Sequence, residues 1–196
     1  MAQQQEKWID PTPASLFLVF CITLVLWAAF TGIISMNAMP VIGYYFLTFG
    51  VLWLIAAVIN FRNGDLLGGA INGVFGIILG LSSGTSLILG TYFASQGVTL
   101  DTRADGLFLF YVGIIFIIFA FCGAKRLWLL FMLLLALGIG FILLGLGMAE
   151  IAGLWAFPIG GWLMFVGGVF SLYTGSAMVV NFSFGRPVLP LGGPLY

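Results

Sequence analysis

Serines are the side chains in this sequence best placed for covalent chemistry, because the segment SSGTS at residues 82–86 lies inside a long apolar run. An intramembrane serine hydrolase normally needs a general base beside the nucleophile, and that base is usually histidine. The 196-residue sequence contains no histidine. We therefore expect no enzymatic activity and no catalytic residue.

Metal and redox chemistry are not indicated either. Metal sites need clustered His, Cys, Asp or Glu side chains, and the sequence places none of these in a cluster. Cys21 and Cys122 lie in two separate apolar segments. A disulfide between them is open in principle, but buried free thiols are the favoured interpretation. We expect no metal and no other cofactor.

The acidic residues all fall in loops or at the ends of apolar segments: Glu6, Asp10, Asp65, Asp101, Asp105 and Glu150. Proton pumps and cation-coupled transporters often carry a buried Asp, Glu or His as a relay, since such a group is costly in a membrane. This sequence has no such group at a span centre. A solute crossing the protein would pass hydroxyls, amides, backbone dipoles and rings.

Composition sets the class of protein. Hydrophobic residues make up 62% of the chain and charged residues 6%, against roughly 45–50% and 25% in a soluble domain. Six cations and six anions cannot cover a water-facing surface of this length, so the chain is an integral membrane protein with lipid around it. The formal charge of zero gives no reason to expect nucleic acid as a partner.

Six segments are long enough to cross a bilayer, which requires about 20 apolar residues each. We predict an all-α protein with spans at 14–36, 41–59, 66–93, 106–121, 127–149 and 157–180. The polar start, residues 1–13, has no signal-peptide pattern. Residues 14–180 form the membrane domain, and residues 181–196 form a tail.

Orientation follows from the cations. One side of the six-span topology would hold five of the six: Lys7, Arg62, Lys125, Arg126 and Arg186. The other side would hold Arg103 alone. The positive-inside rule therefore places both termini in the cytoplasm.

Glycine occurs 28 times, and the third span contains the series Gly76, Gly80 and Gly84. Small residues at this spacing let membrane helices approach closely. Close packing is the favoured interpretation, and a local break that lines a pore is compatible with it. Phe75 lies beside these glycines, so its ring could project into a lumen or fill the hole that they leave.

Two terminal motifs carry a resemblance to a known family. The tail segment FGRPVLPLG, residues 184–192, includes Phe184, Gly185, Arg186 and Pro190. The segment DPTPASL, residues 10–16, precedes the first span. Together with a Gly-Asp entrance to the third span, these segments resemble the acetate uptake transporter family, also called the succinate–acetate permease family. The resemblance covers about residues 8–192.

The resemblance implies a ring-shaped homohexamer of six-helix protomers in the cell (plasma) membrane, each with its own pathway. It also implies uptake of acetate and related short monocarboxylates, by channel conduction or proton symport. The family narrows its pathway with an aromatic residue, a tyrosine and a leucine. The corresponding positions here are Val19, Phe75 and Leu135.

Two further sets of residues are candidates for the pathway. Thr23, one turn deeper than Val19, is a candidate lumen hydroxyl. The helix start at Asp10, Pro11, Thr12 and Pro13 could offer free amides to a carboxylate at the inner mouth. Capping of those amides by Asp10 is the favoured alternative.

The tail contains two prolines, Pro187 and Pro190, which stiffen it and prevent the helix from continuing. We interpret it as a clamp on the cytoplasmic face, with Phe184, Val188 and Leu189 docked and Arg186 bonded to helix carbonyls. The expected function is transport of acetate or a similar monocarboxylate. The alternative is a passive channel for small neutral amides such as urea.

Overall fold

The computed structural model describes residues 7–196 and consists of helices joined by short turns. They are α1 (Thr12–Phe30), α2 (Met39–Arg62), α3 (Leu66–Gly73), α4 (Gly84–Ser95), α5 (Arg103–Ala124), α6 (Trp128–Met148) and α7 (Ala156–Phe184). A short 3₁₀ turn, η1 (Met36–Ala38), precedes α2, and a π-helical segment, η2 (Val74–Ser83), joins α3 to α4 without a break.

The six predicted spans are confirmed: residues 12–30, 36–62, 66–95, 103–124, 128–148 and 156–184 are each long and apolar enough to cross a membrane. The first ends earlier than predicted. Gly32 follows Phe30 with φ +79°, the left-handed conformation that commonly ends helices. The last extends four residues beyond the predicted bound, to Phe184, and Gly185 ends it in the same way.

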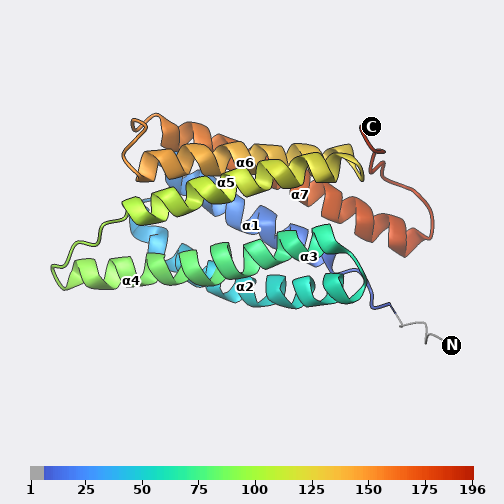
Figure 1. The fold of residues 1–196 in the computed structure, drawn as a ribbon, viewed down its shortest axis with the longest axis horizontal. Coiled ribbons are helices and arrows are strands. Elements are labelled where there is room, and N and C mark those ends of the chain that lie inside the picture. Colours follow the sequence, from blue (N-terminus) through green and yellow to red (C-terminus); the bar gives the residue numbers. More distant parts are fainter. Residues whose placement is uncertain (1–6) are drawn as a thin grey trace.

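The helices form two packed groups, which Figure 1 shows one above the other. The group containing α5, α6 and α7 is joined by α1, which packs mainly on α7. The second group pairs α2 with the long third span, α3–η2–α4. Both termini lie at the same end of the bundle (Figure 1).

Close packing explains the glycines of the third span. A Cβ atom on Gly80 would lie 2.5 Å from the Cα of Gly50 on α2, and one on Gly84 would lie 2.8 Å from the carbonyl oxygen of Gly43. Gly76 is packed equally tightly against Leu54. The helix stays continuous here, and η2 is its only departure from α geometry; π segments are frequent at functional sites.

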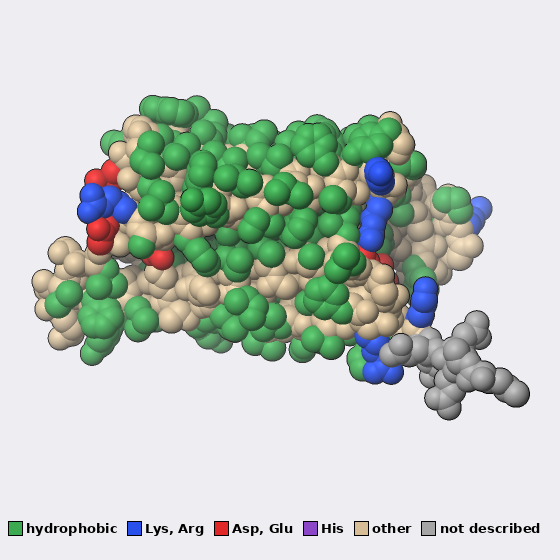
Figure 2. Space-filling view, in the orientation of Figure 1, with side chains coloured by type: hydrophobic (Ala, Val, Ile, Leu, Met, Phe, Trp, Pro, Cys, Tyr) green, Lys and Arg blue, Asp and Glu red, His purple; other side chains and the backbone are tan. Residues whose placement is uncertain are grey.

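The surface matches a membrane protein. Figure 2 shows a broad apolar middle with charged side chains at the two ends. The helix ends and adjoining segments on the side of the termini carry Lys7, Arg62, Lys125, Arg126 and Arg186, whereas Arg103 begins α5 at the other end, beside Asp101. Cys21 and Cys122 are free, but both are exposed, so the prediction that they are buried was wrong.

Candidate functional site

Two cavities enter the bundle from opposite ends. The cavity at the end with the termini, which we call the inner vestibule, has a volume of about 70 Å³. Its polar lining comes from Thr12, Ser15, Asp65, Asn72 and Arg126. Its apolar lining includes Val19 on α1, Phe75 on η2, and Leu133 and Leu134 on α6. The vestibule therefore narrows from a charged mouth to an apolar floor.

The outer vestibule is larger, about 430 Å³, and is lined by residues of the opposite half of the bundle. Asp105 and Glu150 are its only charged lining residues in the described chain, so this mouth is acidic. Its apolar lining includes Leu26 on α1, Leu79 on η2 and Phe141 on α6. The same three elements thus line both vestibules, which places the two cavities along one axis.

A wall of buried apolar side chains separates the vestibules. Phe116 on α5 is fully buried, with its ring centroid 4.9 Å from that of Phe75 and 5.5 Å from that of Phe141. Phe75 faces the inner cavity and Phe141 the outer one, so this chain of rings crosses the barrier. Val19 and Leu26 are seven residues apart, which at 1.5 Å per residue gives a barrier about 10 Å thick.

Trp53 closes the barrier from the α2 side. It is fully buried, its ring lies 5.0 Å from Phe75, and its indole Nε1 donates to the carbonyl of Ser15 at 3.3 Å. Ser171 on α7 donates to the next carbonyl, Leu16, at 2.7 Å. These two bonds tie α1 between α2 and α7 and fix the height of Val19 at the cavity floor.

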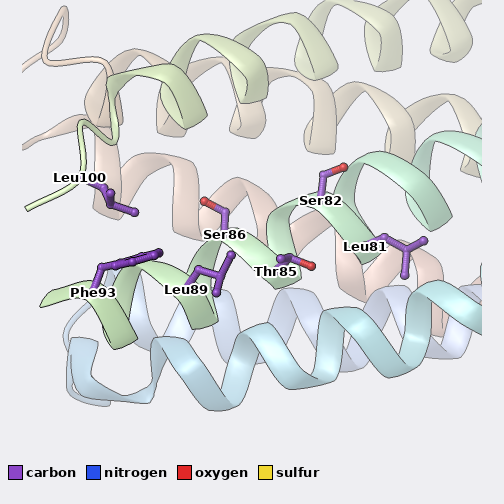
Figure 3. Close-up of a pocket in the computed structure, with 7 residues that line it drawn as sticks. All are labelled: Leu81, Ser82, Thr85, Ser86, Leu89, Phe93 and Leu100. Atoms are coloured by element: carbon purple, nitrogen blue, oxygen red, sulfur yellow. The ribbon is translucent and has the colours of Figure 1, made fainter. Parts of the chain in front are cut away.

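A third hollow lies on the side of the molecule and is shown in Figure 3. It is an open groove of about 530 Å³ that is lined by the third span and by Leu100 of the following loop. Ser86 lines both this groove and the outer vestibule, and its hydroxyl donates to Asp105 at 2.5 Å. The groove and the outer vestibule therefore meet at Ser86.

The charged pair at the inner mouth joins two loops that are distant in sequence. An Arg126 guanidinium nitrogen donates to Asp65 Oδ1 at 2.6 Å, and the same oxygen accepts the Gly68 amide at 2.9 Å as the cap of α3. Partial burial raises the pKa of Asp65, but the Arg126 hydrogen bond and the Gly68 amide lower it by more. The net pKa lies below the ordinary range, so Asp65 is ionised at neutral pH.

The candidate constriction residues are only partly brought together. Val19 and Phe75 both line the inner vestibule. Leu135 packs against the core but lines neither cavity, and its neighbours Leu133 and Leu134 take the facing positions. Thr23 is buried and also lines neither cavity: its hydroxyl donates to the Val19 carbonyl at 2.8 Å and lies against Gly168.

At the predicted helix start, Thr12 lines the inner vestibule, whereas Asp10, Pro11 and Pro13 do not. Asp10 Oδ1 accepts the amide of Thr12, the first residue of α1, at 2.9 Å, so this amide is not free, although the N-cap residue itself, Pro11, provides no side-chain cap. This is the arrangement that we favoured over free amides. The carboxylate of Asp10 would compete with any anion for that donor.

The tail folds back over the end of the bundle, as the clamp interpretation expects. The side-chain hydrogen bonds to its backbone come from residues of α7, however, and not from Arg186. The side chain of Asn181 accepts the Val188 and Leu189 amides at 2.7 and 2.8 Å and donates to the Leu189 carbonyl at 2.8 Å. Tyr173 donates to the Pro190 carbonyl at 2.9 Å. Phe184 and Arg186 are exposed, because the left-handed Gly185 turns the chain away from them.

Sequence reasoning missed Phe116, Leu133, Leu134 and Arg126 as lining or barrier residues. α5 and α6 are apolar around their whole circumference, so no polar stripe sets which side faces the cavity. Arg126 was used only as an orientation marker. The Gly-Asp entrance to the third span identified Asp65 as a charged residue at a span end but gave no partner for it.

Comparisons with known proteins support the fold by structure alone. Neither the search against protein-family models nor the search of curated proteins found a match. The solved structure of the bacterial acetate channel SatP is similar, with a TM-score of 0.81 over 95% of this chain and 100% of that chain. The chain has the SatP fold. The two sequences are 21% identical.

Proposed function

We propose that this protein is a channel or transporter for acetate and related short monocarboxylates. The observation that carries the proposal is the axis of two vestibules separated by a thin, uncharged barrier, in a bundle that shares the fold of an acetate channel. A membrane enzyme or scaffold would not need opposed cavities along one axis.

The barrier suits a small weak acid. An aliphatic carboxylic acid has a pKa near that of Glu, about 4.3, so about one molecule in 500 is neutral at pH 7. An anion in an apolar passage is costly without a compensating charge, and within residues 7–196 no charged side chain is buried in the barrier between Val19 and Leu26. We infer that the permeant crosses as the neutral acid or during brief wetting of the passage.

Val19, Phe75, Leu133 and Leu134 are the residues that we assign to the constriction on the inner side, with Phe116 behind them. Thr23 supports Val19 from the adjacent turn and does not itself contact the permeant. Of the helix-start residues, only Thr12 is assigned to the inner mouth. We assign the tail, with Gly185 and Pro190, to a structural clamp.

The acidic outer vestibule supports discrimination by protonation state. A carboxylate anion there would face Asp105 and Glu150 with no lining cation among the described residues, whereas the neutral acid would feel no such repulsion. Coupled movement of a proton with the acid would follow without a protein relay. This is our proposal for symport.

We further propose that the protein is a homohexamer in the plasma membrane with both termini cytoplasmic. The clustering of five cations at the end with the termini supports the orientation. Native mass spectrometry of the purified protein tests the assembly, and protease access to a terminal tag in sealed vesicles tests the orientation.

The test of function is uptake of labelled acetate and labelled urea into liposomes that contain the purified protein. We expect acetate uptake well above protein-free liposomes, faster with an acidic exterior, and urea uptake at the blank level. Urea uptake in the absence of acetate uptake would support a neutral-amide channel, which the uncharged barrier would also suit, and would refute the carboxylate proposal.

A further inference from the structure

We propose that the inner vestibule is a carboxylate-binding site in which Arg126 and Ser15 hold the permeant anion. When no anion is bound, Arg126 is hydrogen-bonded to Asp65 instead. The inference rests on the proposed function and identifies the residues that set affinity at one mouth. Three separate observations lead to it: a buried hydroxyl without a hydrogen-bond partner, a guanidinium that makes a single hydrogen bond, and a carboxylate of the protein itself bound to that guanidinium.

The Ser15 hydroxyl is the first observation. Ser15 is only 5% exposed, lines the cavity, and its Oγ has no hydrogen-bond partner in the described part of the chain. Other buried hydroxyls are satisfied by helix carbonyls: Thr23 bonds Val19, and Thr174 bonds Phe170. A buried hydroxyl without a partner is unfavourable, so this donor is available to a ligand that enters the vestibule.

Arg126 is the second observation. Its guanidinium lines the same cavity, is 46% exposed, and makes one hydrogen bond within residues 7–196, to Asp65. A guanidinium has five N–H donors arranged in a fork that fits a carboxylate with two parallel bonds. Arg126 can therefore bind a second carboxylate beside Asp65, or release Asp65 and bind another carboxylate in its place.

The bond between Arg126 and Asp65 is the third observation, because the Asp65 side chain is a carboxylate like the expected ligand and shows that Arg126 can bind one here. The Asp65 carboxylate is also bonded to the Gly68 amide at the start of α3. If Arg126 turns to a bound anion, Asp65 keeps this partner and the positive end of the helix dipole. The exchange therefore leaves neither carboxylate without a donor.

The dimensions of the cavity limit the ligand. At about 70 Å³ the vestibule has room for roughly two water molecules by their share of liquid volume, about 30 Å³ each. A single carboxylate with a very short chain fits this space, and its apolar end would lie toward Val19 and Phe75. The site therefore selects short monocarboxylates over longer or doubly charged acids.

The test measures half-saturation for acetate presented at the face that carries the termini, in vesicles whose orientation is fixed by protease access. Asp65→Asn removes the competing charge but keeps a side chain able to cap α3. We expect it to lower the half-saturating concentration, and Arg126→Gln to raise it, each by about three- to tenfold for a half-exposed pair. Ser15→Ala should raise it by about two- to fivefold.

Lys125→Gln is the matched control, because Lys125 is the adjacent cation, is exposed and does not line the cavity. It should leave half-saturation unchanged. The double variant Asp65→Asn/Arg126→Gln should behave like Arg126→Gln alone, since Asp65 acts only by competing for that residue. Acetate flux at saturation, measured for every variant, shows that each protein is folded and inserted.

Wild-type protein that carries no acetate refutes the proposed function itself. Wild-type protein that carries acetate, with the same half-saturation in Asp65→Asn and Arg126→Gln, overturns this inference and leaves the function standing. A shift in Lys125→Gln equal to that in Arg126→Gln would also overturn it, since it would indicate a general surface potential and not a site.

Discussion

Phe116→Ala should open the barrier between the two vestibules. The ring is fully buried and lies between Phe75 and Phe141, which face the inner and outer cavities. Its removal leaves a void at the midpoint of a barrier about 10 Å thick by the helical rise. Water and small solutes would then meet a shorter dry segment.

The size of the effect can be worked from packing. Truncation of a buried Phe to Ala costs about 3–5 kcal/mol of stability, so the variant should unfold at a lower temperature. A barrier lowered by only about 1.4 kcal/mol raises a rate tenfold. We therefore expect acetate flux at least about tenfold above wild type per folded protein, with weaker discrimination against longer acids.

The assay is initial acetate and butyrate uptake in liposomes, normalised to folded protein. Phe119→Ala is the matched control: it lies on the same helix, its ring is 6.2 Å from Phe116, and it lines neither vestibule. It should lose stability without gaining flux. An acetate flux in Phe116→Ala that is unchanged, or equal to that in Phe119→Ala, would refute the assignment of this ring to the barrier.

Three other predictions concern packing, the tail and pH. Gly80→Ala should reduce thermal stability because its Cβ would overlap Gly50, whereas Gly73→Ala, where the space is open, should not; equal melting temperatures would contradict this account. Asn181→Ala removes three hydrogen bonds to the tail and should weaken the docking of the tail by about 1–3 kcal/mol. Limited proteolysis should then cleave the tail faster than in the Ser183→Ala control. The lowered pKa of Asp65 means that its stabilising contribution is present above its ordinary pKa and is lost only as pH falls through the lower folded value. Acetate flux between about pH 5 and pH 7 should therefore follow the neutral fraction of the acid, with the same curve shape in Asp65→Asn; a changed shape would show that Asp65 titrates in this range.

The sequence predicted the number of spans because apolar length is a strong signal that a bilayer imposes directly. It also predicted close packing at Gly80 and Gly84, since small residues at this spacing have few other uses in a membrane helix. The end of the first span was misplaced because Gly32 and the polar turn after it interrupt a run that stays apolar on average.

The barrier was only partly predictable. Val19 and Phe75 were found by alignment outward from motifs, and both line the inner vestibule. On α6, however, the run of leucines contains no polar residue that would show which side of the helix faces the cavity. The sequence alone therefore did not distinguish Leu135 from Leu133 and Leu134, which line the inner vestibule. The Asp65–Arg126 pair joins residues 61 positions apart, and a sequence pattern does not reveal such a contact.

We propose above all that this protein has a dry, uncharged passage that selects small carboxylic acids by width. The most direct measurement compares uptake of acetate and of trimethylacetate by the purified protein in liposomes, since the two acids carry the same charge and differ mainly in girth. The account predicts that acetate crosses and that trimethylacetate stays at the protein-free rate. Equal uptake of the two acids above that rate, or uptake of neither, would contradict it.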